Sequence, residues 1–312
     1  DWIGLTNATD MRNTLGLGSA RPGTGTGSII LGHSTVGTAG GQYSVSAGNN
    51  NTSIGNWSVA MGQSNISRGN WSVAMGGDNE TGTERYSIAM GYNNTSAGHS
   101  SVAMGYSNTS SGWHSVAMGY ENRTIGNYSV AMGFSNNINS PTTGESSFAM
   151  GRYNNYYATS GIASVAMGES NNSGGAYSVA MGESNSSSGD YSVSMGRLNN
   201  SPTPSGASSV AMGEGNASRG VCSVAMGYEN TSFGDFSVAM GKGNNSNSNY
   251  SVAIGASNYA SGQYSFAGGY ANKSKSSMSV CLGRFNTVGE NANYSVAIGL
   301  ENWVDTPASG TI

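Results

Sequence analysis

The chain has 312 residues, of which 49 are glycine and only 9% are charged, and its net charge is −4. Ordinary soluble domains have about 25% charged residues, so the composition argues against a conventional globular enzyme. The 12 Lys and Arg against 16 Asp and Glu exclude the basic surface of a nucleic-acid-binding protein. No window approaches the roughly 18 apolar residues of a membrane span, so we expect no membrane insertion by this chain.

The first 27 residues lie outside the pattern that dominates the rest of the sequence. Because the chain starts at Asp1 rather than Met, we expect either a removed leader or a fragment. Residues 1–27 are apolar in part, and we expect them to be an N-terminal cap or an assembly segment. Their Gly-rich end, 23–27, lacks the Lys of a phosphate-binding loop and is predicted to be a flexible link.

A repeated unit, Ser-Val-Ala-Met-Gly, occurs 19 times between residues 28 and 304, mostly at a step of 14 residues. Val, Ile or Phe follows the Ser in every unit, and Gly stands four positions after it in every unit. Fourteen residues accommodate two short strands and two turns, and one such unit must stack on its neighbours to bury its side chains. The pattern therefore predicts one repeat domain, 28–304, followed by a short tail, 305–312.

The predicted fold is all-β, a β-solenoid of about 19 short coils with parallel sheets. At a spacing of roughly 4.8 Å per coil, the stack would be on the order of 90 Å long. Within each strand Val and Met share one face, while Ser, Ala and Gly share the other. We expect the Val and Met columns to form the interior, and the flat Ser/Ala/Gly face to pack against a second sheet or a neighbouring subunit.

These units resemble the head repeats of trimeric autotransporter adhesins, the YadA-like or Hep/Hag repeats, over most of the chain. The resemblance implies a left-handed parallel β-roll, a homotrimer, and a role as a cell-surface adhesin or fibre head. It covers neither the stalk nor the membrane anchor of those adhesins, because nothing after Asn302 is similar to either.

Asn stands seven positions after the repeat Ser in 18 of the 19 units, and in 13 of these Ser or Thr follows two residues later. Asn can form a hydrogen-bonded ladder between coils, but Asn-x-Ser/Thr is also the acceptor motif for N-glycosylation. Because a ladder alone does not require the hydroxyl, we expect several of these sites to be glycosylated. The candidates are Asn7, in the N-terminal segment, and Asn51, Asn65, Asn79, Asn94, Asn108, Asn122, Asn171, Asn185, Asn199, Asn216, Asn230, Asn244 and Asn272.

An aromatic residue directly precedes the repeat Ser in eleven units and is the predicted contact surface. At coil spacing these rings could stack on sugars or pack against a partner. They are Tyr43, Trp57, Trp71, Tyr86, Tyr128, Tyr177, Tyr191, Phe236, Tyr250, Tyr264 and Tyr294.

The sequence offers little for catalysis, and we predict no catalytic residues, no metal site and no cofactor. His99 and His114 are expected to be surface neighbours without a third ligand. Glu169 and Glu183 are expected to lie one above the other, as solvated like charges. Cys222 and Cys281 are four coils apart, too far for a disulfide between them.

The sequence therefore favours an extracellular or cell-surface adhesive protein, a rod-like adhesin head or a fibre subunit, which is not an enzyme. Its predicted partners are copies of itself, as a homotrimer or filament, and a host or matrix ligand that could be a carbohydrate. The alternatives are an end-to-end polymerising filament protomer, a viral or phage receptor-binding fibre, and a carbohydrate-active β-solenoid enzyme.

Overall fold

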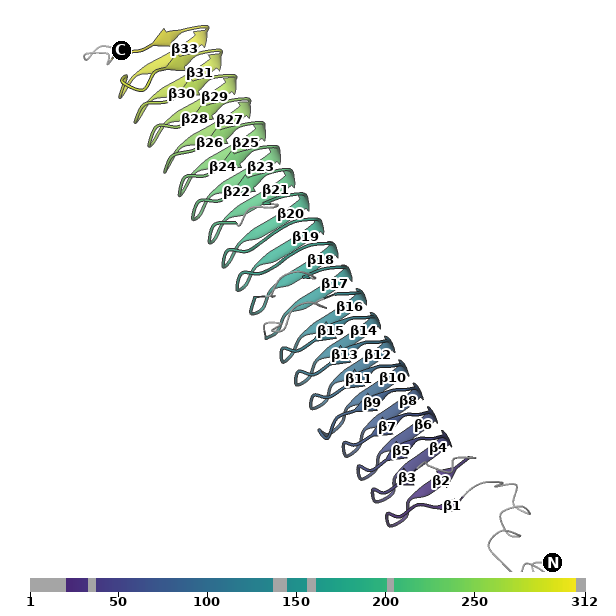
Figure 1. Ribbon diagram of the computed structural model, residues 1–312. Helices are drawn as coiled ribbons and strands as arrows, with labels where there is room; N and C mark the ends of the chain where they lie inside the picture. The colour runs from purple at the N-terminus through teal and green to yellow at the C-terminus, as the bar shows by residue number, and fades with distance from the viewer. Residues whose placement is uncertain (1–20, 33–37, 137–144, 156–160, 201–204, 307–312) are drawn as a thin grey trace, which may run out of the picture. The chain divides into compact units, whose positions relative to one another are not determined.

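The computed structural model describes residues 21–32, 38–136, 145–155, 161–200 and 205–306. The chain divides into two compact units, Asp1–Ser146 and Ser147–Ile312. Each unit, taken by itself, is a stack of flattened coils in which one long strand returns through a second, narrower side (Figure 1). The described residues contain strands and turns without a helix, which confirms the predicted all-β parallel β-solenoid.

In the first unit, β1 is Arg21–Pro22 and eight longer strands each supply one coil. The longer strands are β2 (Ile29–Leu31), β4 (Val45–Asn49), β6 (Val59–Gln63), β8 (Val73–Gly77), β10 (Ile88–Tyr92), β12 (Val102–Tyr106), β14 (Val116–Tyr120) and β16 (Val130–Phe134). Two-residue strands form the second side: β3 (Thr38–Ala39), β5 (Thr52–Ser53), β7 (Ile66–Ser67), β9 (Glu80–Thr81), β11 (Thr95–Ser96), β13 (Thr109–Ser110) and β15 (Arg123–Thr124).

In the second unit, eleven longer strands follow the same plan. They are β17 (Phe148–Arg152), β18 (Val165–Glu169), β19 (Val179–Glu183), β20 (Val193–Arg197), β21 (Val210–Glu214), β23 (Val224–Tyr228), β25 (Val238–Lys242), β27 (Val252–Ala256), β29 (Phe266–Tyr270), β31 (Val280–Arg284) and β33 (Val296–Leu300). The second side contains β22 (Ala217–Ser218), β24 (Thr231–Ser232), β26 (Asn245–Ser246), β28 (Tyr259–Ala260), β30 (Lys273–Ser274), β32 (Thr287–Val288) and β34 (Trp303–Val304).

Neighbouring coils pair in parallel and in strict register, so that each repeat position stacks on its counterpart. In β12 and β14, for example, Val102 pairs with Val116 and Met104 with Met118. Every position of the repeat therefore forms a column of like residues along the unit. This register is why the sequence keeps its slots so strictly.

The strand Gly is invariant because two constraints meet there. Gly105 has φ of +117°, a conformation that residues with a side chain rarely adopt. A Cβ at Gly105 would also overlap the carbonyl oxygen of Gly119 in the next coil. Only glycine satisfies both constraints.

The prediction that Val and Met form the interior was wrong, because the two faces are reversed. The Ala column is fully buried, as at Ala103 and Ala117, and so is the repeat Ser, as at Ser115. Val116 is half-buried, and Met240 is 37% exposed. The coil is so flat that the space between its two sides is filled mostly by Ser, Ala and Asn, with Thr81, Thr124, Cys281 and Val288 also fully buried. The Val and Met side chains of the long strands point outward.

The start of the repeat is more ordered than the sequence suggested. Thr24 N–H donates to the Ala39 carbonyl at 2.9 Å, so the Gly-rich segment packs on the next coil and is not a flexible link. Strand β1 pairs antiparallel with β2, on the edge that faces away from β4. Residues 1–20 lie outside the described residues, so the predicted cap or assembly role of 1–27 stays a prediction.

Candidate interaction surfaces

The Asn column forms a continuous ladder inside each unit. Asn108 Nδ2 lies 2.9 Å from the Met104 carbonyl oxygen, 2.8 Å from that of Gly119, and 3.0 Å from Asn94 Oδ1. The backbone N–H of Asn108 donates to the same Asn94 Oδ1 at 3.0 Å. Each amide therefore joins three successive coils, and Asn108 has no exposed surface.

This burial contradicts the predicted glycosylation at the thirteen repeat positions. An N-linked sugar replaces one Nδ2 hydrogen and needs space beside that nitrogen, but these side chains are at most 1% exposed and their Nδ2 atoms donate into the ladder. The positions concerned are Asn51, Asn65, Asn79, Asn94, Asn108, Asn122, Asn171, Asn185, Asn199, Asn216, Asn230, Asn244 and Asn272. Asn7 lies outside the described residues.

A second interior column explains why Ser or Thr follows so many of these Asn residues. Ser110 Oγ lies 2.6 Å from Ser115 Oγ, and Ser115 Oγ in turn donates to the Gly112 carbonyl at 2.7 Å. Both hydroxyls are fully buried. A buried hydroxyl needs a hydrogen-bond partner, so the motif that imitates a glycosylation site supplies partners within the coil.

The predicted aromatic column lies on the surface, with each ring between 40% and 73% exposed. The residues at this position have positive φ, as in Trp57 (53°) and Trp71 (54°), which turns the side chain outward at the corner of the coil. The rings stack on their neighbours: the centroids of Trp57 and Trp71 are 5.0 Å apart, with the planes 3° from parallel. The same stacking occurs in the second unit between Tyr250 and Tyr264, at 4.8 Å.

A further aromatic column, absent from the predicted contact surface, lies at the last residue of the long strands. Tyr92, Tyr106, Tyr120 and Phe134 stack with centroid separations of 5.5, 4.9 and 4.9 Å. A hydrogen bond with Asp78 raises the pKa of Tyr92. The signal was present in the sequence, as an aromatic directly after the strand Gly in consecutive units.

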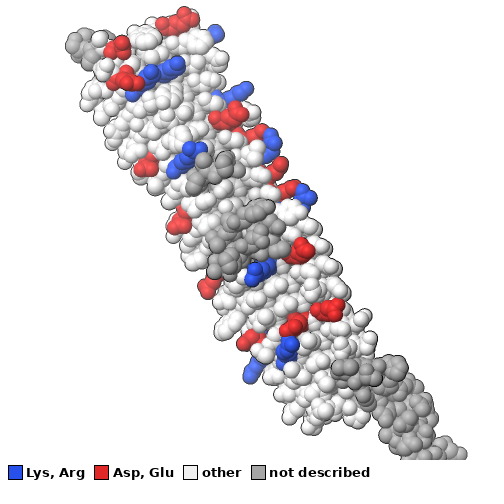
Figure 2. All heavy atoms as spheres, in the orientation of Figure 1, with Lys and Arg blue, Asp and Glu red and all other residues white. Residues whose placement is uncertain are grey.

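Between these two aromatic columns lie the outward Val and Met columns. In the coil of β16, for example, one face of the long-strand sheet presents Tyr128, Val130, Met132 and Phe134 across its width. Charged side chains are sparse and scattered over the white surface in the view of Figure 2. Contiguous apolar surface of this kind marks interaction sites in soluble proteins.

The predicted carboxylate stack exists, and an Arg lies in register on each side of it. Glu169 and Glu183 are paired in register on adjacent strands. Glu169 also forms an ion pair with Arg152, and Arg197 lies in register with Glu183 on the other side. The Glu169 carboxylate holds the pKa of Arg152 above its usual value. This column is therefore a mixed-charge surface ladder and has no arrangement of two carboxylates around a substrate cleft.

The two histidines are neighbours, as expected, with ring centroids 5.7 Å apart. His114 stacks on Tyr128 at 5.3 Å and thereby continues the aromatic column. Within the described ranges, no group of three or more His, Cys, Asp or Glu side chains is placed to hold a metal ion. His33 lies outside those ranges.

Both cysteines are free thiols. Cys222 is exposed at the corner position that aromatic residues fill in other coils. Cys281 is buried in place of the column Ala, and burial raises the pKa of its thiol.

Comparison with known proteins identifies the repeat. The YadA head domain repeat matches residues 83–108, 110–136, 160–182, 173–198, 219–244 and 246–272, with hits in both units. No curated protein matches the chain at a significant level. Where the chain is described, no helix is long and apolar enough to span a membrane.

Proposed function

Because the chain carries YadA head repeats, similar to those of trimeric autotransporter adhesins, we propose that it is the head of a cell-surface adhesin. Those repeats suggest an adhesin-type β-roll, and the parallel β-solenoid described above is in line with that. The observation that supports an adhesive rather than a purely structural role is the pair of exposed, stacked aromatic columns. The role is non-enzymatic and the location is outside the cell.

The assembled form that we propose is a homotrimer in which the outward Val and Met columns meet at the subunit interface. In the single chain these columns lie on the surface of both units, with Met61 at 39% and Met150 at 37% exposure. Among the described residues no element covers this apolar stripe, and packing against two further copies would bury it in each unit. The left-handed turn of the roll is part of the same proposal.

Adhesion would then act through repetition rather than through one deep pocket. Rings at corners of successive coils offer the same weak contact many times, and linked weak contacts raise the overall affinity. Tyr and Trp suit this role because each combines a large apolar area with a polar group. The ligand class that we propose is a matrix or host surface molecule.

The experiment is an adhesion assay with the intact chain on immobilised extracellular-matrix proteins and glycans. The double variant Trp57→Ala with Trp71→Ala removes two adjacent rings from the aromatic column of the first unit. The matched control is Thr109→Ala, which changes an outward side chain of a short strand. We expect at least a ten-fold loss of bound protein for the double variant and none for the control. Wild-type protein that binds no surface, or equal loss in both variants, would contradict the proposal.

A further inference from the structure

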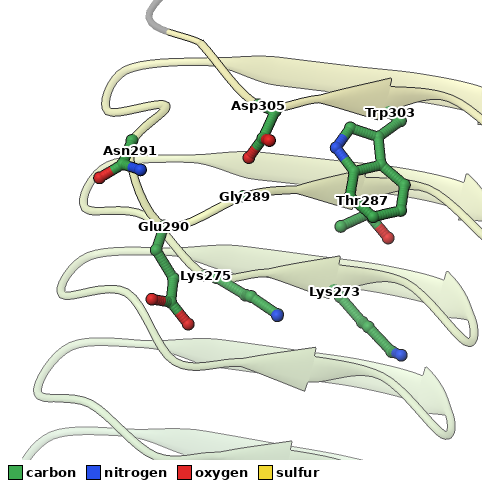
Figure 3. Close-up of a pocket in the computed structure, with 8 residues that line it drawn as sticks. All are labelled: Lys273, Lys275, Thr287, Gly289, Glu290, Asn291, Trp303 and Asp305. Carbon is green, nitrogen blue, oxygen red and sulfur yellow. The ribbon is translucent and has the colours of Figure 1, made fainter.

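The second side of the second unit contains a surface depression of about 260 Å³ between β30 and β34 (Figure 3). Its floor is formed by Thr287 and Gly289 of the intervening coil. Lys273 and Lys275 lie along one wall, and Trp303 lies on the opposite one. The depression is open to solvent on the outward face of the short-strand sheet, away from the Val and Met columns.

The repeat itself explains how this depression forms. Lys273, Thr287 and Trp303 occupy one column, because β30, β32 and β34 pair in register. A small residue therefore stands between two long ones. Two positions after Thr287, Gly289 contributes no side chain. The Asp305 carboxylate occupies the space that a Cβ on Gly289 would fill.

A longer turn adds the remaining wall. The step from Ser279 to Ser295 is 16 residues instead of 14, and the enlarged turn places Glu290 and Asn291 at the edge of the depression. Glu290 projects from this turn on the side away from Trp303. The site thus owes its shape to a departure from the regular repeat at this coil.

The side chains gathered here are rare elsewhere in the chain. Two of the three lysines and one of the five tryptophans of the sequence line this depression. Trp303 is 74% exposed. The ion pairs found among the described residues are Arg68–Glu80, Arg152–Glu169 and Arg197–Glu214. None of these pairs includes Lys273 or Lys275, so neither lysine is in contact with a neighbouring carboxylate in the described part of the chain.

We propose that this depression binds a pyranose that carries a carboxylate, as one unit of an acidic polysaccharide. The sugar's apolar face would stack on the Trp303 indole. Its carboxylate would accept charge-assisted hydrogen bonds from the ammonium groups of Lys273 and Lys275. Its hydroxyls would donate to Glu290 and Asp305. A few polar groups converging on an aromatic surface is the usual composition of a small-ligand site.

A neighbouring depression of about 350 Å³ makes an oligosaccharide a better fit than a single sugar. It shares Lys273, Lys275 and Glu290 with the first, and it adds Tyr259 and Ser261. Tyr259 pairs in register with Lys273, so aromatic rings lie on both sides of the lysines along one column. Tyr259 and Trp303 are three coil steps apart, roughly 14 Å, which leaves room for more than one ring.

This inference rests on the proposed adhesin function and assigns it a ligand class. The probe is a hyaluronan hexasaccharide, in which glucuronate alternates with N-acetylglucosamine, and the neutral comparison is chitin hexasaccharide. Binding of the full chain is measured by isothermal titration calorimetry. The test variants are Lys273→Gln with Lys275→Gln, and separately Trp303→Ala. The matched controls are Lys242→Gln and Trp113→Ala, which change an exposed Lys and an exposed Trp elsewhere.

We expect the wild-type chain to bind hyaluronan hexasaccharide at least ten-fold more tightly than the neutral one. Either test variant should weaken hyaluronan binding at least ten-fold, and both controls should bind as wild type. Equal affinity for the two oligosaccharides, no binding of either, or no difference between test and control variants would overturn the inference. The adhesion assay described above separates the two proposals. If one of these outcomes occurs while the lysine variant still adheres to matrix proteins, the acidic-sugar ligand is rejected and the adhesin function is retained.

Discussion

At the scale of single residues, the strand Gly and the ladder Asn determine how the coils stack. Gly119 has φ of +116° and lies against the Gly133 carbonyl, and Asn122 bonds to that same carbonyl at 2.7 Å. The sequence predicted the importance of both columns from their regular recurrence, Gly in all 19 units and Asn in 18. It did not separate a buried Asn ladder from a glycosylated one, because the Ser or Thr of the acceptor motif is also the interior hydroxyl that pairs with the repeat Ser.

Replacing the strand Gly should therefore destabilise the stack. Gly119→Ala forces an unfavourable backbone conformation and a clash with the next coil, and we expect a loss of about 1–3 kcal/mol in the free energy of unfolding. Chemical denaturation measures this value. The control is Ser111→Ala, an exposed position outside the ladder, which should change stability by less than about 0.5 kcal/mol. Equal stability of Gly119→Ala and wild type would show that the steric argument is wrong.

Removing one ladder amide tests the interior network. Asn108→Ala leaves the Met104 and Gly119 carbonyls without their amide partner, and unsatisfied buried groups cost about 1–3 kcal/mol each. We expect a measurable fall in the unfolding midpoint for Asn108→Ala, whereas the adjacent outward Thr109→Ala should remain near wild type. An Asn108→Ala chain as stable as the control would argue that the ladder is not needed.

The buried thiol offers a third residue-scale prediction. Cys281 is fully enclosed and its pKa is raised by burial. A smaller thiolate fraction and the lack of access both slow alkylation. Iodoacetamide treatment followed by mass spectrometry should leave Cys281 unmodified in the native protein and modify it after denaturation. Rapid native modification of Cys281 would mean that the last coils open readily.

At the scale of the strand, the alternation of inward and outward side chains was predicted correctly, but the set of residues that faces inward was not. Val and Met alternate with Ser and Ala in most units, and burying the apolar set is the usual outcome. Here the space between the two sides of a coil is too narrow for Met. The interior hydroxyls of Ser110 and Ser115 bond within their own coil, and the Asn108 amide bonds to the neighbouring coils. The residue pattern therefore located the strands. Which face of each strand is buried depends on the thickness of the coil, and the sequence of one repeat does not reveal that thickness.

The outward Met column gives a prediction that separates folding from assembly. Met118 is partly exposed in the single chain, so Met118→Glu should leave the coil intact, with a circular dichroism spectrum like that of wild type. In the proposed trimer the same change buries three like charges at one level, which is strongly unfavourable. We expect the trimer to dissociate into single chains, as measured by size-exclusion chromatography with light scattering. Unfolding of the variant would instead indicate that Met118 faces an interior.

At the scale of the whole molecule, the all-β parallel β-solenoid was accessible from the period alone. The acidic-sugar site was not, because Lys273, Thr287 and Trp303 are separated by a coil or more in sequence and come together only through register. The longer turn with Glu290 appeared in the sequence only as an irregular interval. Such departures from a repeat are where a solenoid can place a specific site on an otherwise uniform surface.

The measurement that tests the account most directly is the native mass of the intact chain across a range of concentrations. The outward Val and Met columns and the YadA head repeats together predict a closed species of three 31.7 kDa chains. A single chain at all concentrations, or an open-ended series of multiples, would contradict the trimeric adhesin head.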